Sequence, residues 1–275
     1  MKHPRLILLV LFSVSSVASL SGYAADSTTG SSNVSSAYNE VLSDDYVLMV
    51  FIKPIEARMA ELIHWYQDEH MPEVISRTGF VSGRRYAVVP DQSWLPKQAA
   101  PNPQMVQYNI KTTELEKVFA EDSKLSQAAR LADPPMDPTA TKSYTYQKLG
   151  SEMKGAGPKS TGKSEMKTYE FISLHGPKEG QRDAFNRWYD NHVAEVIQTQ
   201  GFVSAQRYKR SPIQRYSGTD SAPYMVIYTI ATDDLQSVFE ELNKRHDSFA
   251  KSDAIDSSKS STLVYEALSP LIKRK

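Results

Sequence analysis

Two histidines stand in matching surroundings at two places in this 275-residue chain. His70 is followed three residues later by Glu73, and His192 is followed three residues later by Glu195. In a helix this spacing brings the carboxylate beside the imidazole, where it can orient a neutral ring and raise its basicity. A histidine held in this way is suited to accept a proton near neutral pH. We therefore predict general-base catalysis by His70, by His192 or by both, each assisted by its glutamate.

Aromatic residues precede each histidine by about one helical turn. Tyr66 and Tyr189 would each bring a phenol near the imidazole, where it can donate a proton or polarise a carbonyl group. We keep them as candidate catalytic acids, and the adjacent Trp65 and Trp188 as candidate substrate-binding residues. Ordinary core packing is the alternative for these aromatic residues, and also for histidines on an apolar helix face.

An Arg-Tyr pair lies further along each copy, on the following predicted strand. The pairs are Arg85 with Tyr86 and Arg207 with Tyr208. Neighbouring residues of a strand point to opposite faces, so either the tyrosine or the arginine faces a cavity, but not both. An inward arginine would bind a carboxylate or an enolate. All four are candidate substrate-binding residues, and a solvated or salt-bridged arginine is the alternative.

The sequence contains few of the residue patterns that bind metal ions or nucleotides. A His-x-x-Glu pair supplies two ligands, whereas a catalytic zinc normally has three protein ligands, so His64 or His175 would have to complete the set. The chain has no Gly-rich phosphate loop, dinucleotide fingerprint or Gly-x-Ser-x-Gly elbow. We predict no metal site and no nucleotide cofactor.

The candidate residues belong to a repeat that covers most of the chain. In both copies the glycine follows the histidine by nine residues, and the tyrosine follows the glycine by seven. Similar residues recur at intervals of about 120, so the repeat unit is a whole domain rather than a solenoid module. The other matching segments are Tyr46–Pro54 with Tyr169–Pro177, Met105–Ile110 with Met225–Ile230, and Tyr146–Leu149 with Tyr265–Leu268.

Each copy predicts the element order β-α-β-β-α-β. Short apolar runs rich in strand formers predict the strands, and apolar residues at three- and four-residue steps from Phe185 to Ile197 predict a helix. Gly79 and Gly201 are expected to end the first helix of each copy as C-caps. The clearest predicted strands are Val47–Ile52, Phe80–Val89, Met105–Ile110, Glu170–Leu174, Phe202–Lys209 and Tyr224–Ile230.

Both faces of the predicted sheets carry apolar residues, although the two helices of a copy can cover only one face. Val106, Tyr108 and Ile110 alternate with Met105, for example. The two copies can hide their open faces by packing sheet against sheet. We therefore predict an α+β fold in which two ferredoxin-like βαββαβ repeats form one intramolecular barrel. The chain would then be a pseudo-dimeric monomer, with a homo-oligomer as the alternative.

The pattern of Trp-Tyr, His-x-x-Glu-Val and Gly-Phe-Val-Ser-x-x-Arg-Tyr resembles the dimeric α/β-barrel superfamily, and is most similar to its EthD-like branch. The resemblance covers residues 44–149 and 167–268. It implies a ligand cavity between each sheet and its helices or in the barrel interior. The superfamily includes cofactor-free cyclases, isomerases, lyases and monooxygenases, besides haem-dependent peroxidases, and the fold does not choose among them. Haem ligated by one histidine is therefore an alternative to a cofactor-free site.

The two copies differ around the histidine. The EthD-like pattern often has His-x-Pro, which is kept at His70 and Pro72 but lost in the second copy, where Ala194 stands. Proline disfavours helix at the preceding residue, so we expect a break or kink just after His70.

The spacing differs as well. Five residues separate Trp65 from His70, whereas four separate Trp188 from His192. This one-residue insertion could be absorbed as a π-bulge, which is often found at functional sites. If only one half is active, we predict that it is the first.

The first residues and the composition indicate an exported protein. A basic start, an apolar run and small residues before Ala24 are typical of a signal peptide, with an uncleaved anchor as the alternative. The chain has no cysteine, and its 32 basic and 32 acidic residues balance, which argues against nucleic-acid binding and a polybasic membrane patch. The predicted segments are a signal peptide (1–24), a flexible leader (25–43), a first domain (44–149), a linker (150–166) and a second domain (167–275).

These observations favour a periplasmic or secreted, cofactor-independent lyase or isomerase without a stable membrane anchor. The substrate would be a small carbonyl-containing or aromatic molecule. The alternative is a non-catalytic module of the same fold that binds a small ligand or mediates assembly.

Overall fold

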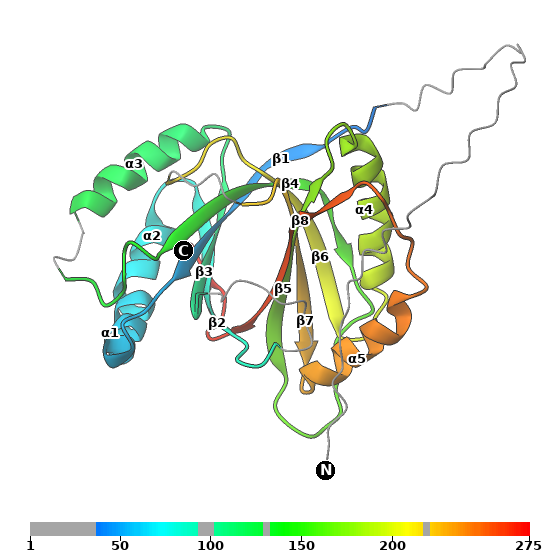
Figure 1. Cartoon of the computed structure of the whole chain (residues 1–275). Coiled ribbons are helices and arrows are strands. Elements are labelled where there is room, and N and C mark those ends of the chain that lie inside the picture. Colours follow the sequence, from blue (N-terminus) through cyan, green and yellow to red (C-terminus); the bar gives the residue numbers. More distant parts are fainter. Residues whose placement is uncertain (1–36, 93–101, 129–132, 217–220) are drawn as a thin grey trace, which may run out of the picture.

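The computed structural model of the protein describes residues 37–92, 102–128, 133–216 and 221–275 (Figure 1). The predicted signal peptide and the leader up to residue 36 lie outside the described residues. The first half contains β1 (Leu42–Ile52), the 3-10 turn η1 (Glu56–Arg58), α1 (Met59–His64), the π turn η2 (Trp65–His70), α2 (Met71–Ser76), β2 (Phe80–Val88), β3 (Gln104–Lys111), α3 (Leu115–Ala128) and β4 (Lys142–Lys154). The second half contains β5 (Lys167–Pro177), α4 (Arg182–Val196), β6 (Phe202–Arg210), β7 (Tyr224–Thr232), α5 (Leu235–His246), β8 (Ile255–Ala267) and the short β9 (Ile272–Lys273).

Eight antiparallel strands close into one barrel. The strand order is β4-β1-β3-β2 in the first half and β8-β5-β7-β6 in the second, the ferredoxin-like order. β4 pairs with β6, and β2 pairs with β8, so the edges of the two sheets are joined at both seams. The predicted α+β fold of two ferredoxin-like repeats in one barrel is confirmed. The halves meet edge to edge, and their open faces become the inside of the barrel.

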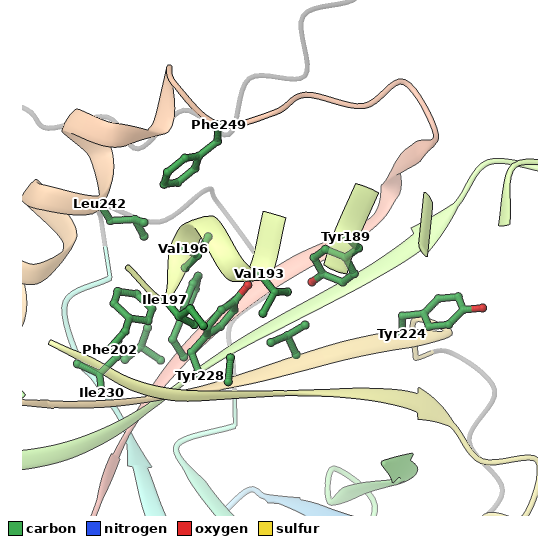
Figure 2. Close-up of a cluster of buried hydrophobic side chains, with 14 of the residues drawn as sticks. Tyr189, Val193, Val196, Ile197, Phe202, Tyr224, Tyr228, Ile230, Leu242 and Phe249 are labelled. Atoms are coloured by element: carbon green, nitrogen blue, oxygen red, sulfur yellow. The ribbon is translucent and has the colours of Figure 1, made fainter. Parts of the chain in front are cut away.

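Helices cover the outside of the barrel, those of the first half on one side of the strands and those of the second half on the other (Figure 1). Between helices and strands lie two apolar cores. Figure 2 shows the second, in which Phe202, Tyr228 and Phe249 pack with side chains of α4 and α5. In the first core Phe80 meets Tyr108 edge to face, with ring centroids 5.8 Å apart. These outer cores fix where α4 and the α1–α2 segment lie over their sheets.

A third core fills the barrel and includes one buried carboxylate. Glu170 on β5 accepts a hydrogen bond from the Tyr86 hydroxyl on β2 at 2.5 Å. With its amide oriented to donate, Gln107 on β3 lies 2.7 Å from the other carboxylate oxygen. Both donors belong to the first half, so the carboxylate ties the halves together inside the barrel. The apolar members of this core are Val47, Met49, Tyr86, Met105, Tyr146, Ile172, Met225, Ile227 and Tyr265.

Two of the glycines with positive φ lie where the first helical segment of each half turns back toward the sheet. Gly79 has φ 85° and Gly201 has φ 107°. A Cβ on Gly79 would lie 2.7 Å from Val118 Cγ2, and one on Gly201 would lie 2.6 Å from Val238 Cγ2. The predicted C-caps are wrong in position, because the helices end earlier, at Ser76 and Val196. Both glycines are required by the turn and by the close approach of α3 or α5.

The leader and linker expected from composition are partly structured. β1 begins at Leu42, and β4 continues to Lys154, whose partner in β6 is Ser204. Beyond it, the Gly155 amide donates to Val203 O at 2.8 Å, and the Thr161 amide donates to Asp233. Backbone hydrogen bonds do not depend on side-chain type, so a Gly- and Ser-rich segment can still lie along a strand edge. None of the helices in the described ranges is long and apolar enough to cross a membrane.

Replacing Gly201 with alanine is expected to destabilise the fold. A non-glycine residue in a left-handed conformation costs roughly 1–2 kcal/mol, and at Gly201 the added methyl also meets Val238. Gly180 is a matched control, because its φ is 72° and its Cβ would meet nothing within 4 Å. Urea unfolding should show a larger loss for Gly201→Ala than for Gly180→Ala, and equal losses would contradict the steric part of this account.

The buried carboxyl predicts a pH dependence of stability. Burial raises the pKa of Glu170 to about 7, against the opposing effects of the Tyr86 hydrogen bond and the Arg84 charge. Because the folded pKa exceeds the ordinary value of 4.5, the associated stability is present below pH 4.5 and is lost as the pH rises through 7. Relative to Glu170→Gln, the unfolding free energy of the parent should fall by on the order of 3 kcal/mol between pH 4.5 and 8. Urea titrations of both proteins across this range measure it, and a constant difference would refute the assignment.

Candidate functional site

The first helical segment contains a π turn that the second half lacks. Trp65–His70 is π-helical between α1 and α2, and the Met71 amide donates to Tyr66 O. By contrast, α4 is α-helical throughout from Arg182 to Val196. The predicted absorption of the one-residue insertion as a π-bulge is therefore confirmed. The insertion gives the first half a local geometry of its own around His70.

Of the break or kink expected after His70, the break is wrong. Met71 keeps helical backbone angles, φ −67° and ψ −43°, and the helix continues to Ser76. A proline ring ordinarily clashes with the carbonyl four residues earlier in an α-helix. Here Pro72 follows directly on the π turn, whose wider spacing leaves room for the ring, so the chain turns without breaking.

His70 lies in an aromatic environment. Its ring stacks on Trp65 with centroids 4.2 Å apart and 13° between planes, and it meets Tyr66 edge to face at 5.2 Å. Burial and the nearby charge of Arg77 lower the pKa of His70 to about 4, so the imidazole is neutral at pH 7. The predicted partner Glu73 instead accepts a hydrogen bond from Arg77 at 2.8 Å. The imidazole is therefore held by aromatic rings rather than by its glutamate.

His192 lies in a similar environment in the second half. It stacks on Trp188 with centroids 4.7 Å apart and meets Phe249 edge to face at 5.7 Å. Glu195 Oε2 lies 3.8 Å from the imidazole Nδ1, too far for a hydrogen bond, and its carboxylate accepts from the Ala250 amide at 3.2 Å. Burial lowers the pKa of His192 to about 4, so the pair is no salt bridge at neutral pH.

Strand parity separates the arginines from the tyrosines that follow them. Tyr86 and Tyr208 belong to the barrel interior. Arg85 and Arg207 are buried on the other face, toward the helices, where the Arg85 charge acts on Tyr66 and Arg207 contacts α4. We call Trp65, Tyr66, His70 and Arg85 the first-half site, and Trp188, Tyr189, His192 and Arg207 the second-half site. The arginines therefore lie on the helix-covered face of the sheet. The two tyrosines lie on the opposite face, inside the barrel.

The phenols at these sites remain protonated. Burial raises the pKa of Tyr66 and that of Tyr189 far above the ordinary value of 10. Ser173 lies beside the Tyr189 hydroxyl, yet the geometry is not that of a hydrogen bond, and within the described residues this hydroxyl has no partner. Both phenols are therefore hydrogen-bond donors at neutral pH.

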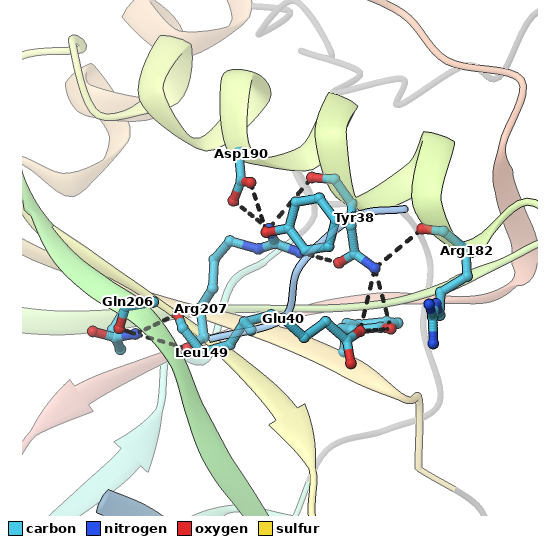
Figure 3. A network of polar contacts seen from close by, with 10 residues as sticks. Tyr38, Glu40, Leu149, Arg182, Asp190, Gln206 and Arg207 are labelled. Atoms are coloured by element: carbon cyan, nitrogen blue, oxygen red, sulfur yellow. Dashed lines mark hydrogen bonds and ion pairs between the residues drawn. The ribbon is translucent and has the colours of Figure 1, made fainter. Parts of the chain in front are cut away.

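Arg207 is fully engaged within the protein, as Figure 3 shows. It forms an ion pair with Asp190, donates to Asn186 Oδ1 at 2.6 Å and to the Tyr38 hydroxyl at 3.2 Å, and lies over the Tyr189 ring. The same N-terminal segment places Glu40 against Lys209 and the Tyr224 hydroxyl. Tyr38 and Glu40 fall in the predicted flexible leader, and composition gave no signal of their contacts.

Arg85 has a different environment. Its residue surface is 4% exposed, and its side chain makes no hydrogen bond or ion pair with any described residue. Burial lowers its pKa, and the opposing effect comes from Tyr66. Asp68, in the π turn, lies on the surface, where its carboxylate accepts a hydrogen bond from His64 Nδ1 at 2.7 Å.

A buried charge network that the sequence did not predict lies beside the first-half site. Asp122 on α3 is paired with Arg77, which follows α2, and with Arg215 from the loop after β6. Such a network joins residues far apart in sequence, so no local motif could have indicated it. It holds the loop of the second half against the helices of the first.

The residues that could complete a metal site do not converge. His64 lies on the surface, and His175 is buried between the hydroxyls of Ser173 and Ser260, at 2.7 and 2.9 Å. In the part of the chain that the structure describes, no group of three or more His, Asp or Glu side chains could hold a metal ion.

Comparisons with known proteins bear on the fold. No family profile matches the chain, and no curated protein sequence matches it. Among solved structures it is similar to a provisionally named monooxygenase from Fusobacterium nucleatum subsp. nucleatum ATCC 25586, with 10% identity, a TM-score of 0.53, and coverage of 84% of this chain and 95% of that chain. It is also similar to an anthrone oxidase-like protein, with 13% identity, a TM-score of 0.51, and coverage of 86% and 96%. Both matches extend over more of the chain than one half supplies, and they support the dimeric α/β-barrel fold.

Both site imidazoles are expected to stay neutral well below their ordinary pKa of 6.5. Since the folded pKa of about 4 lies below the unfolded value, the associated stability is present above pH 6.5 and is lost as the pH falls through 4. NMR titration of histidine-labelled protein, with His70→Gln and His192→Gln for assignment, measures these values. A midpoint near 6.5 for either ring would contradict the burial described above.

Proposed function

We propose that the protein is a cofactor-independent enzyme of the lyase or isomerase kind, acting on a small carbonyl-containing or aromatic molecule at the first-half site. The observation that supports this most is the neutral imidazole of His70, held against Trp65 beside the protonated Tyr66 at the π turn. A base and an acid are thereby placed side by side on one widened helical turn. The second-half site is the poorer candidate, because its arginine is already occupied by Asp190, Asn186 and Tyr38.

The proposed chemistry is proton abstraction next to a carbonyl group. The substrate would lie against the ring of Trp65, and the Tyr66 hydroxyl would donate a hydrogen bond to its carbonyl oxygen. His70 would accept the proton from the neighbouring carbon and return it to another position or to a leaving group. With a pKa of about 4 the free imidazole is a weak base. Negative charge that develops on the bound substrate would raise this pKa during the reaction and so favour the transfer.

We further propose that the chain is an EthD-like protein whose halves arose by tandem duplication, and that it acts in the periplasm or outside the cell. The recurrence of the His-to-Tyr pattern and the matching βαββαβ order of the halves support a duplication. The signal-like start of the sequence and the lack of cysteine support export.

Solvent exchange tests the proposed proton transfer without knowledge of the natural substrate. A panel of enolisable aromatic ketones and aldehydes is incubated with the protein in D₂O, and loss of the α-proton signal is followed by NMR. For at least one compound the parent should exchange about 10²–10⁴-fold faster than His70→Gln. Tyr66→Phe should also be slowed, whereas the matched variant His192→Gln should retain the parent rate.

The other outcomes separate the alternatives. Equal rates for the parent and His70→Gln would remove the catalytic role of His70. Binding of panel compounds without exchange would favour a non-catalytic ligand-binding module. A Soret band in the absorption spectrum of the purified protein would show bound haem and would contradict the hypothesis of a cofactor-independent enzyme.

A further inference from the structure

The one-residue insertion moves an acidic side chain relative to the buried arginine. In the second half an aspartate, Asp190, directly follows the Trp-Tyr pair, and it forms an ion pair with Arg207. In the first half Gln67 takes that place, and Asp68 follows it. The extra residue is accommodated by the π turn, and Asp68 lies on the surface with its side chain 53% exposed, bonded to His64. The two halves therefore keep the arginine, but only the second keeps its counter-ion.

Nearby carboxylates in the first half are committed elsewhere. Glu73 is bonded to Arg77 and is 45% exposed, while Asp122 is shared between Arg77 and Arg215. Arg85 has neither hydrogen bond nor ion pair from its side chain to the described residues, although its residue surface is 4% exposed. A buried cation without a partner is unfavourable, and buried charges in proteins are ordinarily paired. The described residues therefore supply no counter-ion for the Arg85 guanidinium.

Further donors face the same region. The Tyr108 hydroxyl is buried and has no hydrogen-bond partner within the described ranges. Tyr66 and Tyr108 pack in the same core of the first half, and the charge of Arg85 opposes the rise that burial causes in the pKa of Tyr66. None of the Arg85 nitrogens is among the buried polar atoms that lack a partner, so part of its small exposed area lies on the guanidinium. The two protonated phenols and the guanidinium are all hydrogen-bond donors.

We propose that Arg85 is the anchor for a small organic anion, so that the first half selects ligands that carry a carboxylate, enolate or phenolate oxygen. This inference depends on the proposed function for the position of the site, but not on turnover. It also explains the asymmetry, because in the second half Asp190 already neutralises the equivalent guanidinium. The Tyr38 hydroxyl accepts a hydrogen bond from Arg207 and donates one to Asp190.

Matched acids and amides test the proposal in the mature chain. Binding of benzoate and naphthoate is compared with binding of benzamide and naphthamide, which have nearly the same shape but no charge, by calorimetry and by the shift in Tm. The parent should bind at least one acid roughly tenfold or more tightly than its amide, as a charge-assisted hydrogen bond to a guanidinium implies. Arg85→Gln should lose this preference, whereas the matched variant Arg207→Gln should keep it.

Deletion of Gln67 provides a second test, because it restores the spacing of the second half and should return the aspartate to the arginine. The deletion should abolish acid binding while leaving the fold intact by circular dichroism. If that variant does not fold, the comparison of Arg85→Gln with the parent and with Arg207→Gln decides the proposal.

Equal affinity for acid and amide, no binding of either acid by the parent, or unchanged acid binding in Arg85→Gln would each overturn the proposal. These results are independent of catalysis. Acid binding lost in Arg85→Gln but no exchange dependent on His70 would leave the anion site standing and remove the enzyme assignment.

Discussion

The pairing of sheet edges at two seams is the interaction on which the rest of the structure depends. The two sheets are joined through β4 with β6 and, over a shorter stretch, through β2 with β8, and their inner faces share one core. That core contains the Glu170 carboxylate, which is bonded to Tyr86 and Gln107 of the other half. Because the inner face is filled by this core, the helix-covered faces are left to carry the aromatic sites. Closure of the barrel and position of the sites are therefore consequences of one arrangement.

The repeat made the fold predictable, since matching residues at intervals of about 120 define two units and the apolar alternation on both strand faces requires them to combine. The π turn was also predictable, because the insertion between Trp65 and His70 is visible once the copies are aligned. The partners of the glutamates were not. Glu73 accepts a hydrogen bond from Arg77, and Glu195 accepts one from a backbone amide. The spacing of residues within the helix does not reveal these partners. The roles of Tyr38 and of Asp122 were missed for the same reason, since each acts across the boundary between halves.

The halves show how one pattern can acquire two electrostatic environments. Arg85 and Arg207 occupy equivalent strand positions and are almost equally buried. One additional residue in the preceding helix leaves the first without a carboxylate, while the N-terminal segment adds hydrogen-bonding groups to the second. Backbone geometry, rather than a change in the arginine itself, thus decides which of the two arginines has an internal counter-ion. Both histidines keep similar aromatic surroundings, so the difference between the halves lies chiefly in the charges around the arginines.

The seam between β2 and β8 also bears on how the chain reaches its folded state. Arg85 and Ser269 are in contact across this seam, yet they are 184 residues apart in sequence. Contacts of such separation are costly in loop entropy and slow the search for the native topology. During synthesis the outer edge of β2 therefore stays unpaired until β8 has been made. An unpaired strand edge can pair with the wrong segment in the meantime. Closure of the barrel thus depends on a pairing that is among the last to become available to the growing chain.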